Sequence, residues 1–167
     1  MQRIAILGGS GSGKSTLARK LGAALDLPVV HMDQHYFSSG WVEPDHDDWR
    51  ATVAALCAQE KWVMDGNYSK THDIRLSRAD LIIFLDFPTW LCFWRVLKRT
   101  TLGWGKVRPD SATGCPERFD PQFLLYVLNF RRQRAPKIRE LLAGTNCPNR
   151  IFTSTRSVKL WLESLRC

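Results

Sequence analysis

The sequence predicts an α/β domain in three layers, in which helices cover both faces of a parallel β-sheet. Short apolar runs recur along the chain, and they are continuous rather than alternating, which is typical of strands buried on both faces. Longer segments with apolar residues at helical spacing separate these runs, as in α/β domains. A length of 167 residues suits one well-packed domain, so we expect a single domain over residues 1–167.

These patterns predict five strands and five main helices. The strands are expected over residues 3–7, 28–32, 62–64, 81–85 and 150–153. The helices are expected over residues 13–25, 47–59, 121–142 and 157–165, with a further helix that begins at Pro88. Because proline interrupts a helix, Pro136 predicts a kink or a division within residues 121–142.

The composition is that of an ordinary globular protein, with 44% hydrophobic and 24% charged residues. No apolar run approaches the roughly 18 residues that span a bilayer. The N-terminus also lacks a signal-peptide pattern, so we expect a cytoplasmic protein without membrane partners. Five scattered cysteines without a C-x-x-C pair argue against a disulfide framework and against a zinc ribbon. His31 and His35 flank a strand end, which disfavours a metal site there.

The positive charge is concentrated in one segment. Residues 95–139 hold 11 basic and three acidic side chains, a balance of +8 that equals the net charge of the whole protein. This segment is expected to face an anionic partner, either a polyphosphate or a nucleic acid. Within it, residues 101–119 contain three glycines and two prolines and show no apolar periodicity. We therefore expect a lid over about residues 101–120, hinged at Gly103 and Gly105.

A phosphate-binding motif follows the first predicted strand. The stretch Gly8-(x)4-Gly13-Lys14-Ser15 matches the pattern G-x-x-x-x-G-K-[ST] in full, between a strand and a helix. Glycines let backbone N–H groups point at phosphate oxygens, and the helix N-terminus adds its positive dipole end. Lys14 is expected to reach the β- and γ-phosphates of ATP, and the Ser15 hydroxyl to ligate Mg²⁺. The expected nucleotide-binding residues are Gly8, Gly9, Ser10, Gly11, Ser12, Gly13, Lys14, Ser15 and Thr16.

A carboxylate opposite this loop is expected to hold the metal ion. Asp65 and Asp86 both end predicted strands, and by pattern alone the apolar run before Asp86 favours Asp86. The chain resembles nucleoside and nucleotide kinases of the adenylate-kinase type, in which the strand leading to the metal ends in Asp-Gly, as Asp65-Gly66 does here. The resemblance implies a P-loop fold with strand order 2-3-1-4-5. It also implies that Asp65 lies beside metal and substrate, and that Asp86 is a structural or lid-hinge residue.

A closer resemblance runs over nearly the whole chain. The blocks HMDQHYF, WVMDGNYS, RVLKRT and RPD…GCPERF are similar to those of bacterial FlaR-like proteins, also called DNA topology modulation proteins. Those proteins are themselves classed with the adenylate-kinase-related P-loop kinases. Arg95 and Arg99 match the paired arginines beside the lid of adenylate kinases, where they neutralise charge on the transferred phosphoryl group. The alternative interpretation of the pair is an exposed basic helix face.

The acceptor side departs from adenylate kinases. After Asp-Gly those enzymes continue Phe-Pro-Arg, and that arginine holds the phosphate of the acceptor; here the residues are Asn67-Tyr68-Ser69. The expected acceptor segment, about residues 33–60, carries a single arginine, Arg50. Both differences disfavour a nucleoside monophosphate as acceptor. The aromatic residues of the segment suit a ring or a neutral hydroxyl compound better.

The remaining candidate residues are assigned by position. Shikimate and uridine kinases, which this chain resembles, place an acid near the acceptor hydroxyl at the position of Asp33. We therefore expect Asp33 to orient the acceptor or to act as general base, with a loop-capping aspartate as the alternative. Trp41 and Tyr68 are expected to contact the acceptor, and Arg156 lies where related kinases hold the adenine. The candidate lid clamps are Arg108, Arg118, Arg131 and Arg134, of which the last two are expected to point in the same direction.

Two functions compete on these grounds. The first is a Mg²⁺- and ATP-dependent kinase whose acceptor is a nucleoside, a nucleotide or another hydroxyl compound. The second is a nucleic-acid-binding protein in which the basic segment contacts DNA and the ATP site acts as a switch. Kinases need arginines in a lid, and no helix-turn-helix or zinc finger is recognisable, so the sequence favours the kinase.

Overall fold

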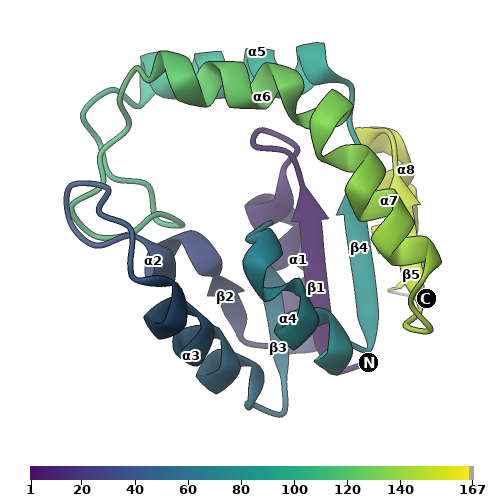
Figure 1. Ribbon diagram of the computed structural model, residues 1–167. Helices are drawn as coiled ribbons and strands as arrows, with labels where there is room; N and C mark the ends of the chain where they lie inside the picture. The colour runs from purple at the N-terminus through teal and green to yellow at the C-terminus, as the bar shows by residue number, and fades with distance from the viewer. Residues whose placement is uncertain (166–167) are drawn as a thin grey trace.

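The computed structural model describes residues 1–165, which contain one parallel sheet of five strands (Figure 1). The strand order, β2-β3-β1-β4-β5, confirms the predicted order. In the sheet Ile6 pairs with Asp65 and Gly8 pairs with Leu85, so the carboxyl ends of the three central strands reach the same edge. The strands are β1 (Arg3–Gly8), β2 (Val29–His31), β3 (Trp62–Asp65), β4 (Leu81–Leu85) and β5 (Asn149–Phe152).

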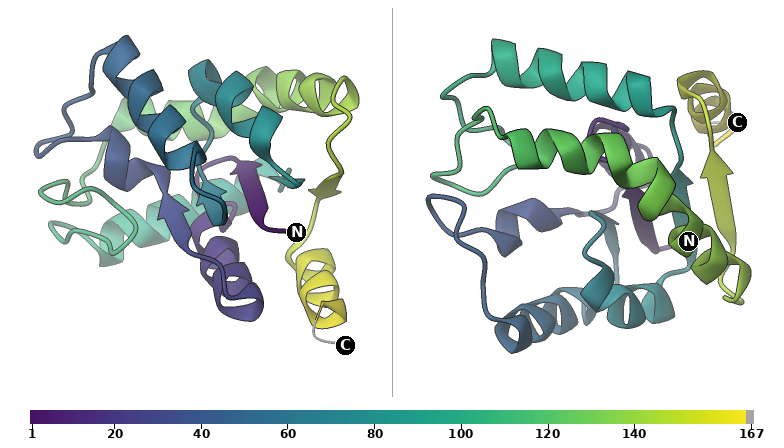
Figure 2. Two further views of the ribbon diagram at one scale, coloured as in Figure 1. Left: turned by 90° about the horizontal axis from the view of Figure 1, so that it is seen from below. Right: turned by 45° about the horizontal axis from the view of Figure 1, so that its top comes forward.

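Helices cover both faces of the sheet and complete the three predicted layers (Figure 2). One hydrophobic cluster joins the sheet to α3 (His46–Cys57), α4 (His72–Arg78) and α7 (Ala135–Ala143). The other joins it to α1 (Lys14–Leu25), α5 (Thr89–Leu102) and α8 (Thr155–Ser164). Helix α6 (Pro121–Gln133) lies beside α5 and contributes Phe130 to the first cluster and Val127 to the second. Two short elements complete the chain, α2 (Met32–Tyr36) and the 3₁₀ helix η1 (Ser69–Thr71).

The predicted division of residues 121–142 is confirmed, and the elements differ from the predicted ones in two other respects. Residues 121–142 form two helices divided at Arg134, and Pro136 lies in the first turn of α7, where its missing N–H is not needed. The short elements α2, η1 and α4 were not predicted, because three to seven residues are too few for a helical period to show. Strand β5 is exposed at three of its four residues, because it forms an edge of the sheet and is not covered on both faces.

Two expectations from composition can be compared with the described residues. Within residues 1–165, no helix has both the length and the apolar character needed to cross a membrane. Cys57, Cys92, Cys115 and Cys147 are free thiols, and Cys167 lies outside the described residues.

Candidate active site

The phosphate-binding loop connects β1 to α1 and folds as its glycines require. Gly11 and Gly13 adopt positive φ angles of 80° and 92°, which side chains rarely allow. A Cβ atom on Gly11 would also lie 2.3 Å from the carbonyl oxygen of Cys92. Glycine at this position therefore lets the loop pack directly against α5. Helix α1 begins at Lys14, so its N-terminus lies at the end of the loop.

Lys14 is half-buried at the loop, and its Nζ donates to the carbonyl oxygen of Gly9 at 3.0 Å. Burial lowers the pKa of this ammonium group, and the negative charges of Asp65 and Asp33 oppose that effect. The Lys14 ammonium group thus lies in the electric field of Asp33 and Asp65, both of which were predicted site residues. A nucleotide phosphate would give it a further anionic partner.

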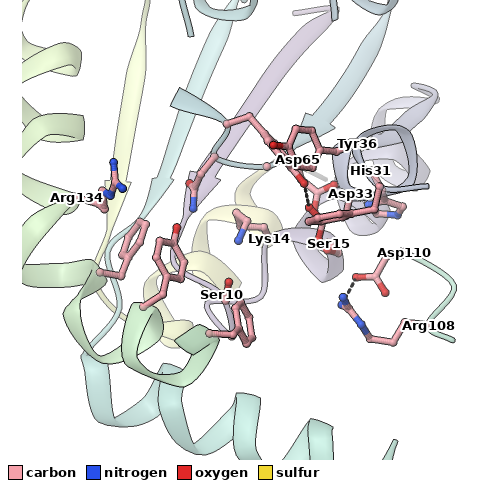
Figure 3. Close-up of a pocket in the computed structure, with 18 of the residues that line it drawn as sticks. Ser10, Lys14, Ser15, His31, Asp33, Tyr36, Asp65, Arg108, Asp110 and Arg134 are labelled. Carbon is pink, nitrogen blue, oxygen red and sulfur yellow. Dashed lines mark hydrogen bonds and ion pairs between the residues drawn. The ribbon is translucent and has the colours of Figure 1, made fainter. Parts of the chain in front are cut away.

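A cavity of about 1090 Å³ opens in front of the loop. Figure 3 shows Lys14 and Ser15 at this cavity close to Asp33 and Asp65, with Ser10 farther away on the loop. Of the nine predicted loop residues, Ser10, Gly11, Gly13, Lys14, Ser15 and Thr16 line the cavity. Gly8, Gly9 and Ser12 form the part of the loop behind this lining, and Ser12 is buried.

Two hydrogen-bonded pairs organise the carboxylates at the edge of the sheet. The Asp65 carboxylate, 5% exposed, lies 2.6 Å from the Nδ1 atom of His31 on the neighbouring strand. The Tyr68 hydroxyl donates to Oδ1 of Asp33 at 2.6 Å. Burial, followed by the charge of Asp33, raises the pKa of Tyr68 far above its ordinary value, so the phenol stays protonated and remains a donor.

Two residues without a predicted role stabilise the loop after β3: Asn67 lies in that loop, and Arg75 lies on α4. Asn67 hydrogen-bonds to Gly8 of the phosphate loop through both polar atoms of its side chain. Arg75 is fully buried and donates to the carbonyl oxygens of Gly66, at 2.8 Å, and of Asn67. It stabilises a loop in which Tyr68 has a φ of 33°, a strained value for a residue with a side chain. The sequence pointed to Asn67 only as a departure from Phe-Pro-Arg, and nothing in it singled out Arg75.

The acceptor segment forms an aromatic wall of the cavity. The Tyr36 ring lies 4.6 Å from that of Tyr68 and 4.9 Å from that of Trp49, measured between ring centroids. Phe37 and Trp41 extend this wall toward the lid. Arg50, the single arginine of the segment, does not line the cavity, because it pairs with Asp73 at 2.6 Å.

The lid is docked on the acceptor segment through a backbone hydrogen bond and through the side chain of Trp41. Gly40 donates to the carbonyl oxygen of Gly114 at 3.0 Å, and the Trp41 indole donates to that of Pro116 at 3.2 Å. In Figure 1 the loop between α5 and α6 accordingly lies beside the loop after α2. The Arg118 guanidinium also lies over the Trp41 ring, 5.6 Å from its centroid.

Arginines of α5 and the lid converge on one buried acid. Glu117 is 6% exposed, and its Oε1 atom lies 3.2 Å from Nε of Arg99 and 2.5 Å from Nε of Arg108. Arg108 also pairs with Asp110 at 3.1 Å. Both arginines line the cavity, so Glu117 holds their guanidinium groups facing it. Arg99 and Arg108 were predicted site residues, but Glu117, which positions them, was not.

The other predicted basic residues separate into two groups. Arg95 lines the cavity and donates to the Thr155 hydroxyl at 3.0 Å, and Arg134 also lines it. Arg131 does not line it, because it pairs with the buried carboxylate of Asp86 at 3.3 Å, together with Arg139. The expectation that Arg131 and Arg134 point the same way is wrong, since α6 ends between them. Arg156 is exposed on α8, away from the cavity lining.

Asp86 and Asp65 therefore differ in what surrounds them. Asp86 is 2% exposed, and its charge is balanced by the two arginines, which is a structural environment. Asp65 borders the cavity, and its charge opposes the lowering of the Lys14 pKa by burial. This arrangement agrees with the preference that the resemblance gave to Asp65.

No protein-family model matches the chain, and no curated protein matches it either. Among solved structures it is similar to shikimate kinase from Acinetobacter baumannii in complex with shikimate. That match has a TM-score of 0.65 and 16% identity, over 99% of this chain and 90% of that chain. Deoxyadenosine kinase from M. mycoides gives a TM-score of 0.55 at 15% identity, over 98% and 95% of the two chains. Shikimate kinase from Aquifex aeolicus gives 0.56 at 17% identity, again over 98% and 95%.

These similarities establish the fold, an α/β P-loop kinase fold of the adenylate-kinase type with the strand order given above. At such identities they establish nothing about the substrate. The resemblance to FlaR-like proteins is not confirmed by them and stays a prediction.

Proposed function

We propose that the protein is a kinase that transfers the γ-phosphoryl group of ATP to a hydroxyl group of a small molecule. The observation that carries this proposal is that the phosphate loop and Asp33 border the same cavity, where the charge of Asp33 reaches Lys14. In this proposal residues 33–60 form the acceptor segment and residues 101–120 the lid of a single kinase domain over residues 1–167.

The loop supplies the donor site. Its backbone N–H groups and the N-terminus of α1 bind the phosphates, and Lys14 contacts the β- and γ-phosphates. Arg95, Arg99 and Arg108 line the cavity and offer guanidinium groups to the oxygens on which charge is concentrated during transfer. The lid excludes water, so that the phosphoryl group passes to the acceptor.

The donor atoms beside the loop fit Mg²⁺, which prefers oxygen ligands and keeps phosphates and waters among them. The Ser15 hydroxyl and the Asp65 carboxylate provide such oxygens at the cavity. Within residues 1–165, no three His, Cys, Asp or Glu side chains are grouped closely enough to hold a metal by themselves. When bound, the ion would neutralise charge on the β- and γ-phosphates.

Asp33 acts on the acceptor. Its carboxylate takes the proton of the acceptor hydroxyl as the new P–O bond forms, and the bond between the γ-phosphorus and the bridging oxygen breaks to leave ADP. Tyr68 donates to Oδ1 of Asp33 and leaves the second carboxylate oxygen for the acceptor. The aromatic wall suits an acceptor with a ring, such as a nucleoside or another cyclic hydroxyl compound.

The distribution of charge favours the kinase over the nucleic-acid-binding alternative. Six of the 11 basic side chains in residues 95–139 line the cavity: Arg95, Arg99, Arg108, Arg118, Arg134 and Lys137. Positive charge directed into a cavity serves a small anionic ligand better than a DNA backbone. A DNA affinity that falls steeply with salt and ignores ATP would instead support the alternative.

An acceptor screen that measures ADP release tests the proposal, with Lys14→Ala as the blank. Because Lys70, Arg134 and Lys137 also line the cavity, the panel should include acceptors with a carboxylate or phosphate beside neutral ones, with shikimate and deoxyadenosine among them. We expect one acceptor class to raise ADP release above the blank, and Asp33→Asn to reduce that rate at least 100-fold. The absence of release above the blank across the panel would overturn the proposal.

A further inference from the structure

An exposed apolar surface lies outside the cavity, on helices α5 and α6. The two helices contact each other and run together along the top of the molecule in Figure 1. On α5, Trp90 is 71% exposed and Trp94, one helical turn later, is 60% exposed. On α6, Leu125 is 58% exposed and Leu128 is 45% exposed. We call Trp90, Trp94, Leu125 and Leu128 the apolar face.

The apolar face is turned away from the core. The buried residues of α5, which are Cys92, Val96 and Thr100, share the other side of that helix. On α6 the buried residues are Val127 and Phe130. The tryptophans and leucines of the apolar face are therefore not needed for packing within the chain. Large apolar side chains gathered on one exposed surface mark a site of interaction.

The charges carried by these two helices are all positive. Neither α5 nor α6 contains an acidic residue. Lys98 follows Trp94 by four residues and Arg132 follows Leu128 by four, so each cation lies on the same side of its helix as the apolar residues. Both are exposed, and within residues 1–165 neither forms an ion pair with a carboxylate. The apolar face is thus bordered by cations without partners.

The same combination of side chains continues into the lid. Trp104 and Val107 are exposed on either side of Lys106, directly after the end of α5. The nearest acid, Asp120, precedes α6 and caps that helix by accepting hydrogen bonds from the backbone N–H groups of its first turn. A surface of tryptophans, aliphatic side chains and cations therefore extends from α5 and α6 to the start of the lid.

A bilayer with anionic lipids complements this surface in both respects. Tryptophan favours the boundary between headgroups and acyl chains, and leucine buries apolar area there. Lysine and arginine beside them are attracted to anionic headgroups. A second copy of the chain would bring Lys98 and Arg132 against like charges, with no acid of α5 or α6 to balance them. A nucleic acid would stack on the tryptophans but would leave the leucines unused.

We propose that the apolar face binds to the surface of membranes that carry anionic lipids. In this proposal the two tryptophans and the two leucines enter the headgroup region, and Lys98 and Arg132 contact the headgroups. The composition had predicted no membrane partner because the chain lacks a long apolar run, but a surface built from two helices leaves no such run in the sequence. The phosphate loop takes no part, so the inference is independent of the proposed function.

Sedimentation with vesicles tests the inference. The full-length protein is mixed with vesicles of phosphatidylcholine alone, or of phosphatidylcholine and phosphatidylserine in equal parts. We expect the wild type to partition onto the anionic vesicles at least about tenfold more strongly than onto the neutral ones, and salt to weaken this binding. The double variant Trp90→Ser/Trp94→Ser and the double variant Lys98→Gln/Arg132→Gln should each lower the partition coefficient at least about tenfold.

Two controls match these changes at exposed positions elsewhere. Leu160→Ser removes an exposed apolar side chain of α8, and Lys20→Gln removes an exposed charge of α1. Both should partition as the wild type does. All the substituted side chains are exposed, so urea unfolding should show the same stability for every variant and exclude misfolding as the cause of a loss.

A second readout separates insertion from attraction by charge alone. Lipids brominated in their acyl chains quench the fluorescence of tryptophans that enter the bilayer. Anionic vesicles of such lipids should quench the wild type, and Trp90→Phe/Trp94→Phe, which keeps apolar rings, should still bind but lose most of the quenching. Unchanged quenching in this variant would contradict insertion of the apolar face.

Several results would overturn the inference. The wild type could stay in solution with both kinds of vesicle, bind the neutral vesicles equally well, or partition no more strongly than the two double variants. A dimer that forms without lipid and dissociates in Trp90→Ser/Trp94→Ser, measured by analytical ultracentrifugation, would assign the face to a second copy. A single-stranded oligonucleotide that binds more tightly than the anionic vesicles, with binding lost in the same variant, would assign it to nucleic acid.

The two proposals fail separately. Lys14→Ala should bind anionic vesicles as the wild type does, because the phosphate loop lies outside the apolar face. Acceptor-dependent ADP release without vesicle binding would contradict only the membrane surface, and vesicle binding without ADP release would contradict only the proposed function.

Discussion

The side chain of Asn67 hydrogen-bonds to both backbone polar groups of Gly8. The Gly8 N–H donates to Oδ1 at 2.9 Å, and Nδ2 donates to the Gly8 carbonyl oxygen at 2.6 Å. The pair joins the loop after β3, which carries Tyr68, to the first residue of the phosphate loop. The acceptor side and the donor side of the cavity are thereby connected through one amide.

Replacing Asn67 by alanine should weaken nucleotide binding. The change leaves two partly buried backbone groups of Gly8 without partners, at a cost of about 1–3 kcal/mol in the free energy of unfolding. We expect roughly tenfold weaker binding of an ATP analogue, since about 1.4 kcal/mol corresponds to a factor of ten. Calorimetry and urea unfolding measure the two effects. The control is Asn129→Ala, which removes an exposed hydrogen bond within α6. Equal losses of binding affinity and of stability in the two variants would contradict the prediction.

Arg75→Met should destabilise the fold through the loop after β3. The guanidinium is fully buried, and burial lowers its pKa to about 10, so its charge is costly to place there. Its N–H groups nevertheless donate to the carbonyl oxygens of Gly66 and Asn67. We expect the loss of these hydrogen bonds to outweigh the relief of the buried charge and to lower the free energy of unfolding by about 3 kcal/mol. Urea unfolding measures the change. The control is Arg78→Met, at an exposed position of α4, whose free energy of unfolding should stay within about 0.5 kcal/mol of wild type. If Arg75→Met leaves the free energy of unfolding unchanged, the prediction is wrong, because relief of the buried charge then offsets the lost hydrogen bonds.

Acidification should destabilise the protein through His72. Burial, followed by the charge of Arg75, lowers the pKa of His72 to about 4, and its Nε2–H donates to the Asn67 carbonyl oxygen at 2.5 Å. Because the folded-state pKa lies below the unfolded value of about 6.5, this contribution is complete above pH 6.5 and is lost as the pH falls toward 4. Between pH 7 and pH 5 the loss amounts to about 2 kcal/mol.

His72→Gln isolates this effect, because glutamine keeps a donor for Asn67 but does not titrate. Chemical unfolding at pH 7 and pH 5 should show a smaller decrease in stability for this variant than for the wild type. His46→Gln, at an exposed position, should retain the full decrease. His35, whose pKa burial also lowers, contributes equally to all three proteins. Identical decreases in His72→Gln and wild type would show that His72 does not titrate as expected.

Trp41→Ala should loosen the lid. The indole donates to Pro116 and lies under Arg118, so its removal deletes a hydrogen bond and a cation–π contact between the lid and the acceptor segment. We expect trypsin to cleave within residues 101–120 several-fold faster, because cleavage follows the population of the open segment. Trp104→Ala, at an exposed tryptophan of the same lid, serves as control. An ATP analogue with Mg²⁺ should slow cleavage of the wild type, and an unchanged rate would argue against lid closure on the nucleotide.

The sequence predicted the sheet well, because its three inner strands and the phosphate loop depend on local patterns. Continuous apolar runs locate β1, β3 and β4, and the glycines before Lys14 can serve few other structures. Asp33 and Asp65 follow predicted strands, but the resemblance to known kinases selected them, because the strand pattern by itself favoured Asp86.

The contacts that shape the site could not be predicted from local sequence patterns. Arg131 and Arg134 are three residues apart, yet one neutralises Asp86 and the other borders the cavity, because α6 ends between them. Glu117 and Asp110 are two acidic residues of the lid that nothing in the sequence distinguishes. The docked lid buries Glu117 among arginines and places Asp110 beside Arg108 at the cavity. Asn67 and Arg75 act on backbone groups, which leave no signature in side-chain chemistry.

The sequence by itself therefore determined the α/β fold class and the phosphate loop, because these follow from local periodicity and from a motif of fixed spacing. The strand order and the choice of Asp33 and Asp65 came from the resemblance to known kinases. The tertiary structure decided which arginines face the cavity, how the lid docks on residues 38–42 and what holds the loop after β3. The physical reason is that those contacts join residues far apart in the chain through burial and hydrogen bonds, which no spacing along the sequence encodes.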